Sequence, residues 1–345
     1  MKSKKALFAG LCAAALMPQF AQAEGVVNLY IWSGYIDPVA VKQFEDKTGI
    51  KVRIDNYDSE ETLLAKLKQG GGGYDVAVAS QAMVPVLEHE QLIQKVAVRD
   101  LPGYNKIIPK LHKPEWDPTG DYSVPYLWGT TNFAVDTSVY NGPIDSLKVL
   151  FTPPPQLRGK VNMLGSASDS VSLASIAAGV PLCSEDPKQM KKVQDLLLQQ
   201  KPYVRTYNSK AGAIRESMVS GEIAISSIWN GTAQRAREMK KSIRYVFPKE
   251  GSLAWVDNMV VPTGAPNLEN AKRLLAFLMQ PDVAAKNSTF LKYQNPIQGS
   301  EKFLSQEIRD MPELNPPANA RMVFLKACSE KAVRMRDLIW TSLLK

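Results

Sequence analysis

Between residues 26 and 79 the sequence alternates between strand and helix patterns, and this alternation constrains the fold more than any other feature. The run 26–32 is apolar and β-branched with one polar break, which is typical of a buried strand. The expected elements, in order, are a strand at 26–32, a helix at 39–48 after Asp37-Pro38, a strand at 51–57, a helix from an Asp58/Glu61 capping box to about Gln69, and a strand at 74–79. Strands joined through helices pair in parallel with right-handed crossovers, so an α/β fold is predicted.

The chain begins with an export pattern. Residues 1–5 hold three lysines and no acid, residues 6–17 are apolar, and Ala21-Gln-Ala23 offers small residues before a cleavage point. We therefore predict a cleaved signal peptide over 1–23 and a periplasmic location; the alternative is a buried N-terminal helix. Leu11 precedes Cys12, where a lipid anchor would need a small residue, and no later run approaches about 20 apolar residues.

The mature length predicts two domains, because about 320 residues exceed what one hydrophobic core usually holds. The later extended segments are expected at 122–126 and 130–135, and the later strands at 161–164, 223–228 and 254–261. The later helices are expected after 164 to about 178, and at 186–200, 211–220, 267–279, 282–290 and 318–344. Asn267 is expected to cap the helix at 267–279, and the last helix has one possible break. The chain leaves the first unit and returns to it. This predicts two lobes around a hinge and central cleft: lobe 1 at 24–125 plus 250–300, and lobe 2 at 126–249 plus 301–345, with the C-terminal helices packing across the hinge.

The charge distribution argues against a nucleic-acid partner. Cleavage removes three of the 42 basic residues and none of the 34 acids, so the net charge falls from +8 to +5. The remaining basic residues alternate with acids, as in 186–192, which is typical of solvated helix faces rather than of a continuous basic stripe.

The cysteines and histidines limit the chemistry. Cys183 and Cys328 are the two cysteines of the mature chain, and in an oxidising compartment we predict that they form a disulfide; two separate buried thiols are the alternative. The chain has only His89 and His112, neither close in sequence to a cysteine, so a Cys/His metal site or nucleophile has little support.

Three motifs place aromatic residues near predicted strand ends: 32–35 (Trp-Ser-Gly-Tyr), 229–231 (Trp-Asn-Gly) and 255–257 (Trp-Val-Asp). In parallel sheets the loops after the strands form the ligand site, which also singles out Ser80 and Gln81. An indole beside a carboxylate suits an alkylammonium ion, because the acid accepts charge-assisted hydrogen bonds and the ring face attracts the cation. A single tryptophan is more often core packing, but three on separate loops at strand ends favour a binding site.

The chain resembles the periplasmic polyamine (putrescine/spermidine)-binding proteins of ABC importers. The matching stretches, in the family's order, are 29–36, 74–80, 124–130, 221–222 with 228–231, 250–251 with 255–257, and 293–296. The resemblance implies a type II periplasmic-binding-protein fold whose lobes close over a ligand, and delivery of that ligand to a permease in the inner membrane. By position the family's ligand-lining residues are Trp32, Ser33, Tyr35, Ser80, Trp229, Trp255, Asp257 and Tyr293.

The sequence departs from this family at the second ammonium site. Ser170 aligns with the family's glutamate, the nearby Asp169 is out of register, and Gly34 and Thr232 stand where putrescine binders tend to carry acids. Asp257 is then the one firm ammonium partner, and an unpaired buried ammonium costs several kcal/mol. One hypothesis is an ω-amino acid such as 4-aminobutyrate or 5-aminovalerate, with its carboxylate held by serine hydroxyls, Ser170 among them, and by backbone amides at a helix start. The other is a polyamine whose far end meets Asp169 or water.

An enzyme and a signalling receptor subunit are the two alternative functional classes. An enzyme would need a nucleophile and base at fixed spacing or a cofactor loop, and neither pattern is present, so we expect no catalysis and no cofactor. A receptor subunit that signals through a membrane partner would present the same surface on closure as an importer subunit. We further expect no bound metal, a monomer, and a small amine as ligand.

Overall fold

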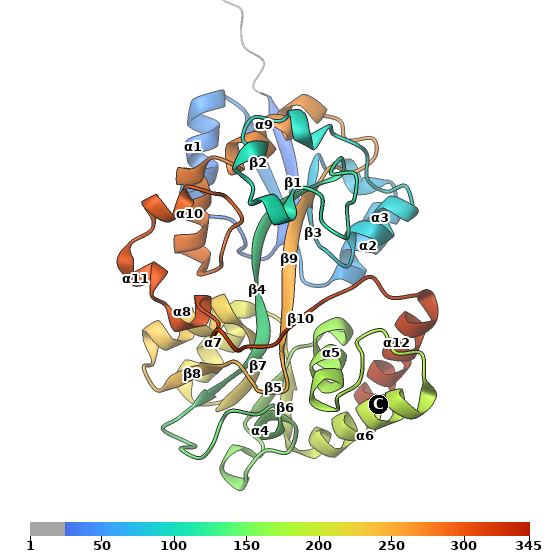
Figure 1. The fold of residues 1–345 in the computed structure, drawn as a ribbon, viewed down its shortest axis with the longest axis vertical. Helices are drawn as coiled ribbons and strands as arrows, with labels where there is room; N and C mark the ends of the chain where they lie inside the picture. Colours follow the sequence, from blue (N-terminus) through green and yellow to red (C-terminus); the bar gives the residue numbers. More distant parts are fainter. Residues whose placement is uncertain (1–24) are drawn as a thin grey trace, which may run out of the picture.

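The computed structural model describes residues 25–345, so the predicted signal peptide lies outside the described residues. The chain forms a mixed α/β structure with two masses joined by long strands (Figure 1). The strands are β1 (Val26–Trp32), β2 (Lys51–Tyr57), β3 (Val76–Ser80), β4 (Ser123–Asp136), β5 (Val161–Met163), β6 (Val204–Tyr207), β7 (Ile225–Trp229), β8 (Ile243–Val246), β9 (Ser252–Val260) and β10 (Met322–Phe324). The helices are α1 (Pro38–Thr48), α2 (Glu60–Lys68), α3 (Val84–His89), α4 (Lys148–Phe151), α5 (Ala167–Ala177), α6 (Pro187–Gln200), α7 (Ala211–Ser220), α8 (Asn230–Met239), α9 (Leu268–Leu278), α10 (Pro281–Leu291), α11 (Gln306–Arg309) and α12 (Glu330–Leu344).

The strands follow the order β2-β1-β3-β9-β4-β7-β5-β6, with β10 paired to β9 and β8 paired to β4. The predicted parallel pairing of the first three strands is confirmed, since β1 runs parallel to both β2 and β3. β4 and β9 are antiparallel partners that run through both masses, as Figure 1 shows at its centre. These two strands are therefore the hinge of the molecule.

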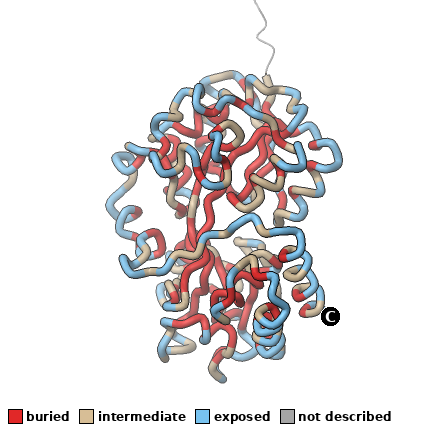
Figure 2. Tube along the Cα trace, turned by 45° about the vertical axis from the view of Figure 1, so that its right-hand side comes forward, coloured by how far each residue is buried: buried red, intermediate tan, exposed pale blue. Residues whose placement is uncertain are grey.

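Most of the buried apolar residues fall into two regions on either side of this hinge, and a small separate cluster holds Ile308, Met311 and Leu314. One region draws on residues 27–127 and 255–297, and the other on 133–253 and 339–343. We call them lobe 1 and lobe 2. Figure 2 shows a buried interior in each, with the strands between them also buried. This distribution supports the predicted lobe boundaries, which remain a prediction.

The C-terminal segment is a third connection between the lobes, and it crosses as an extended segment where a helix was predicted. Residues 318–329 are not helical: β10 pairs in parallel with β9 at Ser252–Ala254, and the helix begins only at Glu330, capped by the Ser329 hydroxyl. The prediction of a helix over 318–344 is therefore wrong for its first part. The apolar run 322–325 pairs with the hinge strand instead, and Leu325 packs against the cores of both lobes.

The predicted disulfide is confirmed. Cys183, between α5 and α6, is bonded to Cys328, just before α12, across a sequence separation of 145 residues. The bond therefore attaches the C-terminal helix to lobe 2.

Three local expectations change. The two extended segments at 122–126 and 130–135 are one strand, β4, with an irregularity between Pro125 and Leu127. Ser59 rather than Asp58 caps α2, since its hydroxyl accepts from the Thr62 amide. Asn267 precedes α9 without a side-chain cap. Within the described part of the chain no helix is long and apolar enough to cross a membrane.

Candidate functional site

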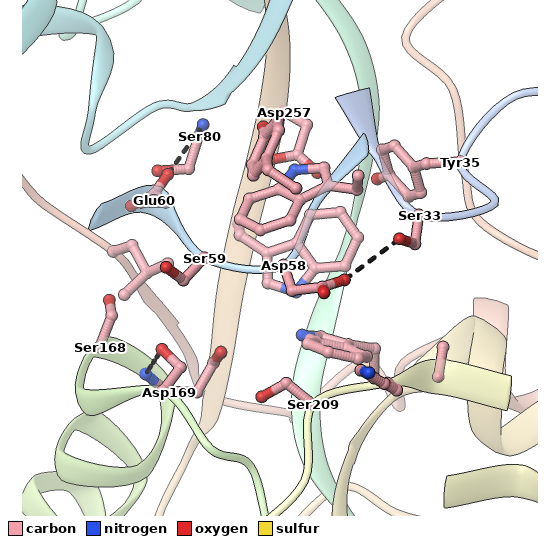
Figure 3. Close-up of a pocket in the computed structure, with 18 of the residues that line it drawn as sticks. Ser33, Tyr35, Asp58, Ser59, Glu60, Ser80, Ser168, Asp169, Ser209 and Asp257 are labelled. Carbon is pink, nitrogen blue, oxygen red and sulfur yellow. Dashed lines mark hydrogen bonds between the residues drawn. The ribbon is translucent and has the colours of Figure 1, made fainter. Parts of the chain in front are cut away.

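A cavity of about 130 Å³, partly open to solvent, lies between the lobes (Figure 3). Its walls combine aromatic rings, serine hydroxyls and four carboxylates. The lining residues are Trp32, Ser33, Tyr35, Tyr57, Asp58, Ser59, Glu60, Ser80, Ser166, Ser168, Asp169, Ser209, Lys210, Ala211, Trp229, Trp255, Asp257, Tyr293 and Leu325.

The loop after β1 places the first group. Gly34 adopts a positive φ of 66°, which a side chain would strain, and this turn follows directly on Trp32 at the end of the strand. The Trp32 ring packs on Tyr57 with ring centroids 4.3 Å apart. The turn thus presents an aromatic ring and the Ser33 hydroxyl to the cavity from the carboxyl end of β1.

The hinge strand β9 supplies Trp255 and Asp257 to the same face, as predicted from strand alternation. Asp257 is 6% exposed and stands opposite Ser80 in the ladder with β3. Burial, together with the charges of Glu60 and Asp169, raises the pKa of Asp257 to about 7. The buried Tyr35 hydroxyl lies beside Asp257, and its interaction with the carboxylate offsets part of the rise in the Asp257 pKa.

Lobe 2 contributes an acid from the start of α5. The Ser166 hydroxyl caps this helix by accepting from the Asp169 amide at 3.3 Å, and the Asp169 side chain lines the cavity. The Thr131 hydroxyl donates to Asp169 Oδ1 at 3.3 Å. Burial, together with the charge of Glu60, raises the pKa of Asp169 to about 7. A second acid therefore lines the cavity in addition to Asp257, as the polyamine alternative with Asp169 at the far end requires.

Two acids of the segment after β2 line the cavity but were not predicted as site residues. Glu60 accepts from the Ser80 amide at 3.1 Å, and burial raises its pKa. Asp58 accepts from the Ser33 hydroxyl at 3.1 Å (Figure 3). Ligands bind at the loops after parallel strands, and this rule applies to the loop after β2 as well as to those after β1 and β3. The capping-box pattern, however, assigned Asp58 to the start of the helix.

One cation and one helix end lie on the lobe 2 side. Lys210, Ala211 and Ser209 line the cavity at the start of α7, whose N-terminus has no side-chain cap. The Ser209 Oγ is buried without a partner in the described chain. Free backbone amides at a helix start favour a negative group.

Eight of the ten predicted ligand residues line this one cavity: Trp32, Ser33, Tyr35, Ser80, Trp229, Trp255, Asp257 and Tyr293. Gln81 and Ser170 do not. Gln81 binds the hinge strand, accepting from the Val256 amide at 2.7 Å. Ser170 is fully buried and donates to the Leu164 carbonyl at 2.6 Å, because α5 turns it away from the cavity.

The charges and rings together favour a cationic ligand with an apolar body. Four carboxylates and one lysine line the cavity. The Tyr293 ring packs against Tyr35 and Trp255, with centroid distances of 5.6 and 5.3 Å. Among residues 25–345 no three His, Cys, Asp or Glu side chains gather where they could hold a metal ion.

A family model, characterised relatives and a solved structure all place the chain in the same family. The family model for the bacterial extracellular solute-binding proteins matches residues 39–316. The spermidine/putrescine-binding periplasmic protein of Escherichia coli (strain K12) is 32% identical, covering 92% of this chain and 90% of that protein. The putrescine/agmatine-binding protein of Pseudomonas aeruginosa is also 32% identical, covering 92% of both chains.

A solved structure confirms the predicted type II periplasmic-binding-protein fold. The spermidine/putrescine ABC transporter substrate-binding protein of Streptococcus pneumoniae is similar with a TM-score of 0.77 at 25% identity, covering 93% of this chain and 98% of that one.

Proposed function

The chain belongs to the bacterial extracellular solute-binding proteins, and we propose that it captures a small polyamine in the periplasm and delivers it to the permease of an ABC importer. The relatives at 32% identity are named for binding spermidine, putrescine or agmatine. These ligands carry separated cationic groups on an apolar chain.

The observation that carries this proposal is the presence of acids on both sides of the cavity. Asp257 extends from the hinge strand, Glu60 lies on lobe 1, and Asp169 lies on lobe 2. Figure 3 shows Asp257 and Asp169 on opposite sides of the cavity. An extended diamine can place one ammonium near each, which relieves the mutual repulsion of the acids. The aromatic rings between them cover the methylene chain.

An ω-amino acid such as 4-aminobutyrate or 5-aminovalerate is the second candidate. It is favoured by one observation: Lys210 and the uncapped start of α7 lie in the cavity wall, where they could hold a carboxylate. Against it stand Asp169, Asp58 and Glu60, which would repel an anion in the same cavity. The diamine therefore remains the first candidate.

Calorimetric titration of the ligand-free protein with putrescine, spermidine, agmatine, 4-aminobutyrate and 5-aminovalerate separates the two candidates. We expect tight binding of at least one polyamine and weak binding of the amino acids. Tight binding of 4-aminobutyrate or 5-aminovalerate without polyamine binding would overturn the first candidate. Asp257→Ala should abolish binding of either class, because both require an ammonium site at Asp257.

The relatives are periplasmic binding proteins and not enzymes, so the proposed role is binding without catalysis. Their membership of importers favours delivery to a permease over signalling through a sensor. The monomeric state and the lack of a nucleic-acid partner remain predictions.

A further inference from the structure

We propose that Thr131, which does not line the cavity, is the positioning residue that holds Asp169 and Trp255 in the geometry a cationic ligand requires. Its side chain is fully buried in β4, on the lobe 2 side of the hinge. The proposal rests on the proposed function, since the two residues it orders belong to the ligand cavity.

The Thr131 hydroxyl has one hydrogen and two lone pairs, and both neighbours determine how they are used. The Trp255 indole N–H can only donate, and it donates to Thr131 Oγ1 at 3.2 Å. The single hydroxyl hydrogen is therefore available to Asp169 Oδ1, at 3.3 Å. The two hydrogen bonds therefore run in one direction, from the Trp255 indole through the Thr131 hydroxyl to the Asp169 carboxylate of lobe 2.

Gly129 makes this contact possible. It pairs with Trp255 across the β4–β9 ladder, and a Cβ atom at Gly129 would lie 2.8 Å from Trp255 Cζ2. The indole therefore lies against bare backbone, and its N–H reaches the hydroxyl two residues further along the same strand. Only a residue without a side chain at 129 permits this approach.

The same threonine also borders the third tryptophan of the site. In the ladder between β4 and β7, Thr131 stands directly opposite Trp229. One buried residue thus touches or borders three lining residues, which come from β7, β9 and α5. An ammonium bound at Asp169 is consequently held beside the Trp255 ring, where cation–π attraction adds to the ion pair.

Thr131→Val tests the role, because it removes the hydroxyl and keeps the shape. We expect putrescine affinity to fall about tenfold, as for loss of a hydrogen bond to a charged group. Thr131→Ser retains the hydroxyl and should recover most of the affinity. The matched control is Thr130→Val: Thr130 is equally buried, but its hydroxyl bonds Tyr245 at 2.7 Å and touches no lining residue.

A readout without ligand separates positioning from general destabilisation. Carbon-13 NMR titration of the Asp169 carboxyl should show a higher pKa in Thr131→Val than in the wild type, because a donor to the ionised form is lost, and no change in Thr130→Val. Wild-type affinity and an unchanged Asp169 titration in Thr131→Val would overturn the proposal, as would equal losses of affinity in both valine variants. Failure of the wild type to bind any polyamine would instead overturn the proposed function, and the NMR comparison would still decide the role of Thr131.

Discussion

Polyamine binding should release protons, and the number contributed by two side chains that line the cavity can be calculated. Asp257 and Asp169 both have pKa values raised to about 7, by burial first and then by Glu60, so each carboxyl is partly protonated near neutral pH. An alkylammonium ion, with a pKa of about 10, stays charged and binds the ionised carboxylates. Binding therefore lowers both pKa values and expels the protons.

At pH 7 each carboxyl is about half-protonated, so about one proton should leave per ligand. At pH 6 both carboxyls are mostly protonated and about two protons should leave, whereas at pH 8 both are mostly ionised and few should leave. The sign follows from the raised pKa values: affinity increases as pH rises through 7. If both carboxyls must ionise fully, putrescine affinity should be about 100-fold higher at pH 8 than at pH 6.

Isothermal titration calorimetry in phosphate and Tris measures this number, because the two buffers differ in ionisation enthalpy. Asp169→Asn should remove more than half of the released protons at pH 7, because one of the two groups is gone and the pKa of Asp257 falls without the Asp169 charge. Equal heats in both buffers, with affinity independent of pH between 6 and 8, would refute the electrostatic account of the cavity.

Two further perturbations test the hinge and the C-terminal connection. Gly231→Ala places a Cβ atom 2.6 Å from the Leu291 carbonyl oxygen of lobe 1, so ligand affinity should fall. Gly212→Ala in α7 is the control, because a Cβ atom there meets nothing within 4 Å and should leave the affinity unchanged. Equal affinities for both variants would contradict this prediction. Replacing Cys183 and Cys328 together with serine opens a connection across 145 residues, and the free energy of unfolding in urea should drop by about 2–5 kcal/mol; undiminished stability would show that the disulfide contributes little.

Local patterns were sufficient for much of the fold. The β1–α1–β2–α2–β3 alternation, the parallel pairing and the loops after the strands depend on residues close together in sequence, so periodicity and turn residues predict them. The same reasoning located Trp32, Trp255 and Asp257, because a strand end and its alternation decide which side chains face the cavity.

The second half of the cavity was decided by tertiary structure. Position in a family alignment favoured Ser170 over Asp169, but the pitch of α5 buries the serine and turns the aspartate to the cavity. Asp58 was assigned to a helix cap that Ser59 provides, which leaves its carboxylate free for Ser33. Neighbouring side chains on a helix point in different directions. The packing of α5 against the hinge therefore decides that Asp169, rather than Ser170, lines the cavity.

The sequence by itself therefore predicted a periplasmic α/β protein with aromatic strand ends, and it singled out Asp257 as the proposed ammonium partner. Tertiary structure decided the charge of the cavity, because the acids that complete it come from β2–α2 and α5, segments about 110 residues apart that only the fold brings to one cavity. It also decided the path of residues 318–329, where pairing with the hinge strand replaced a helix.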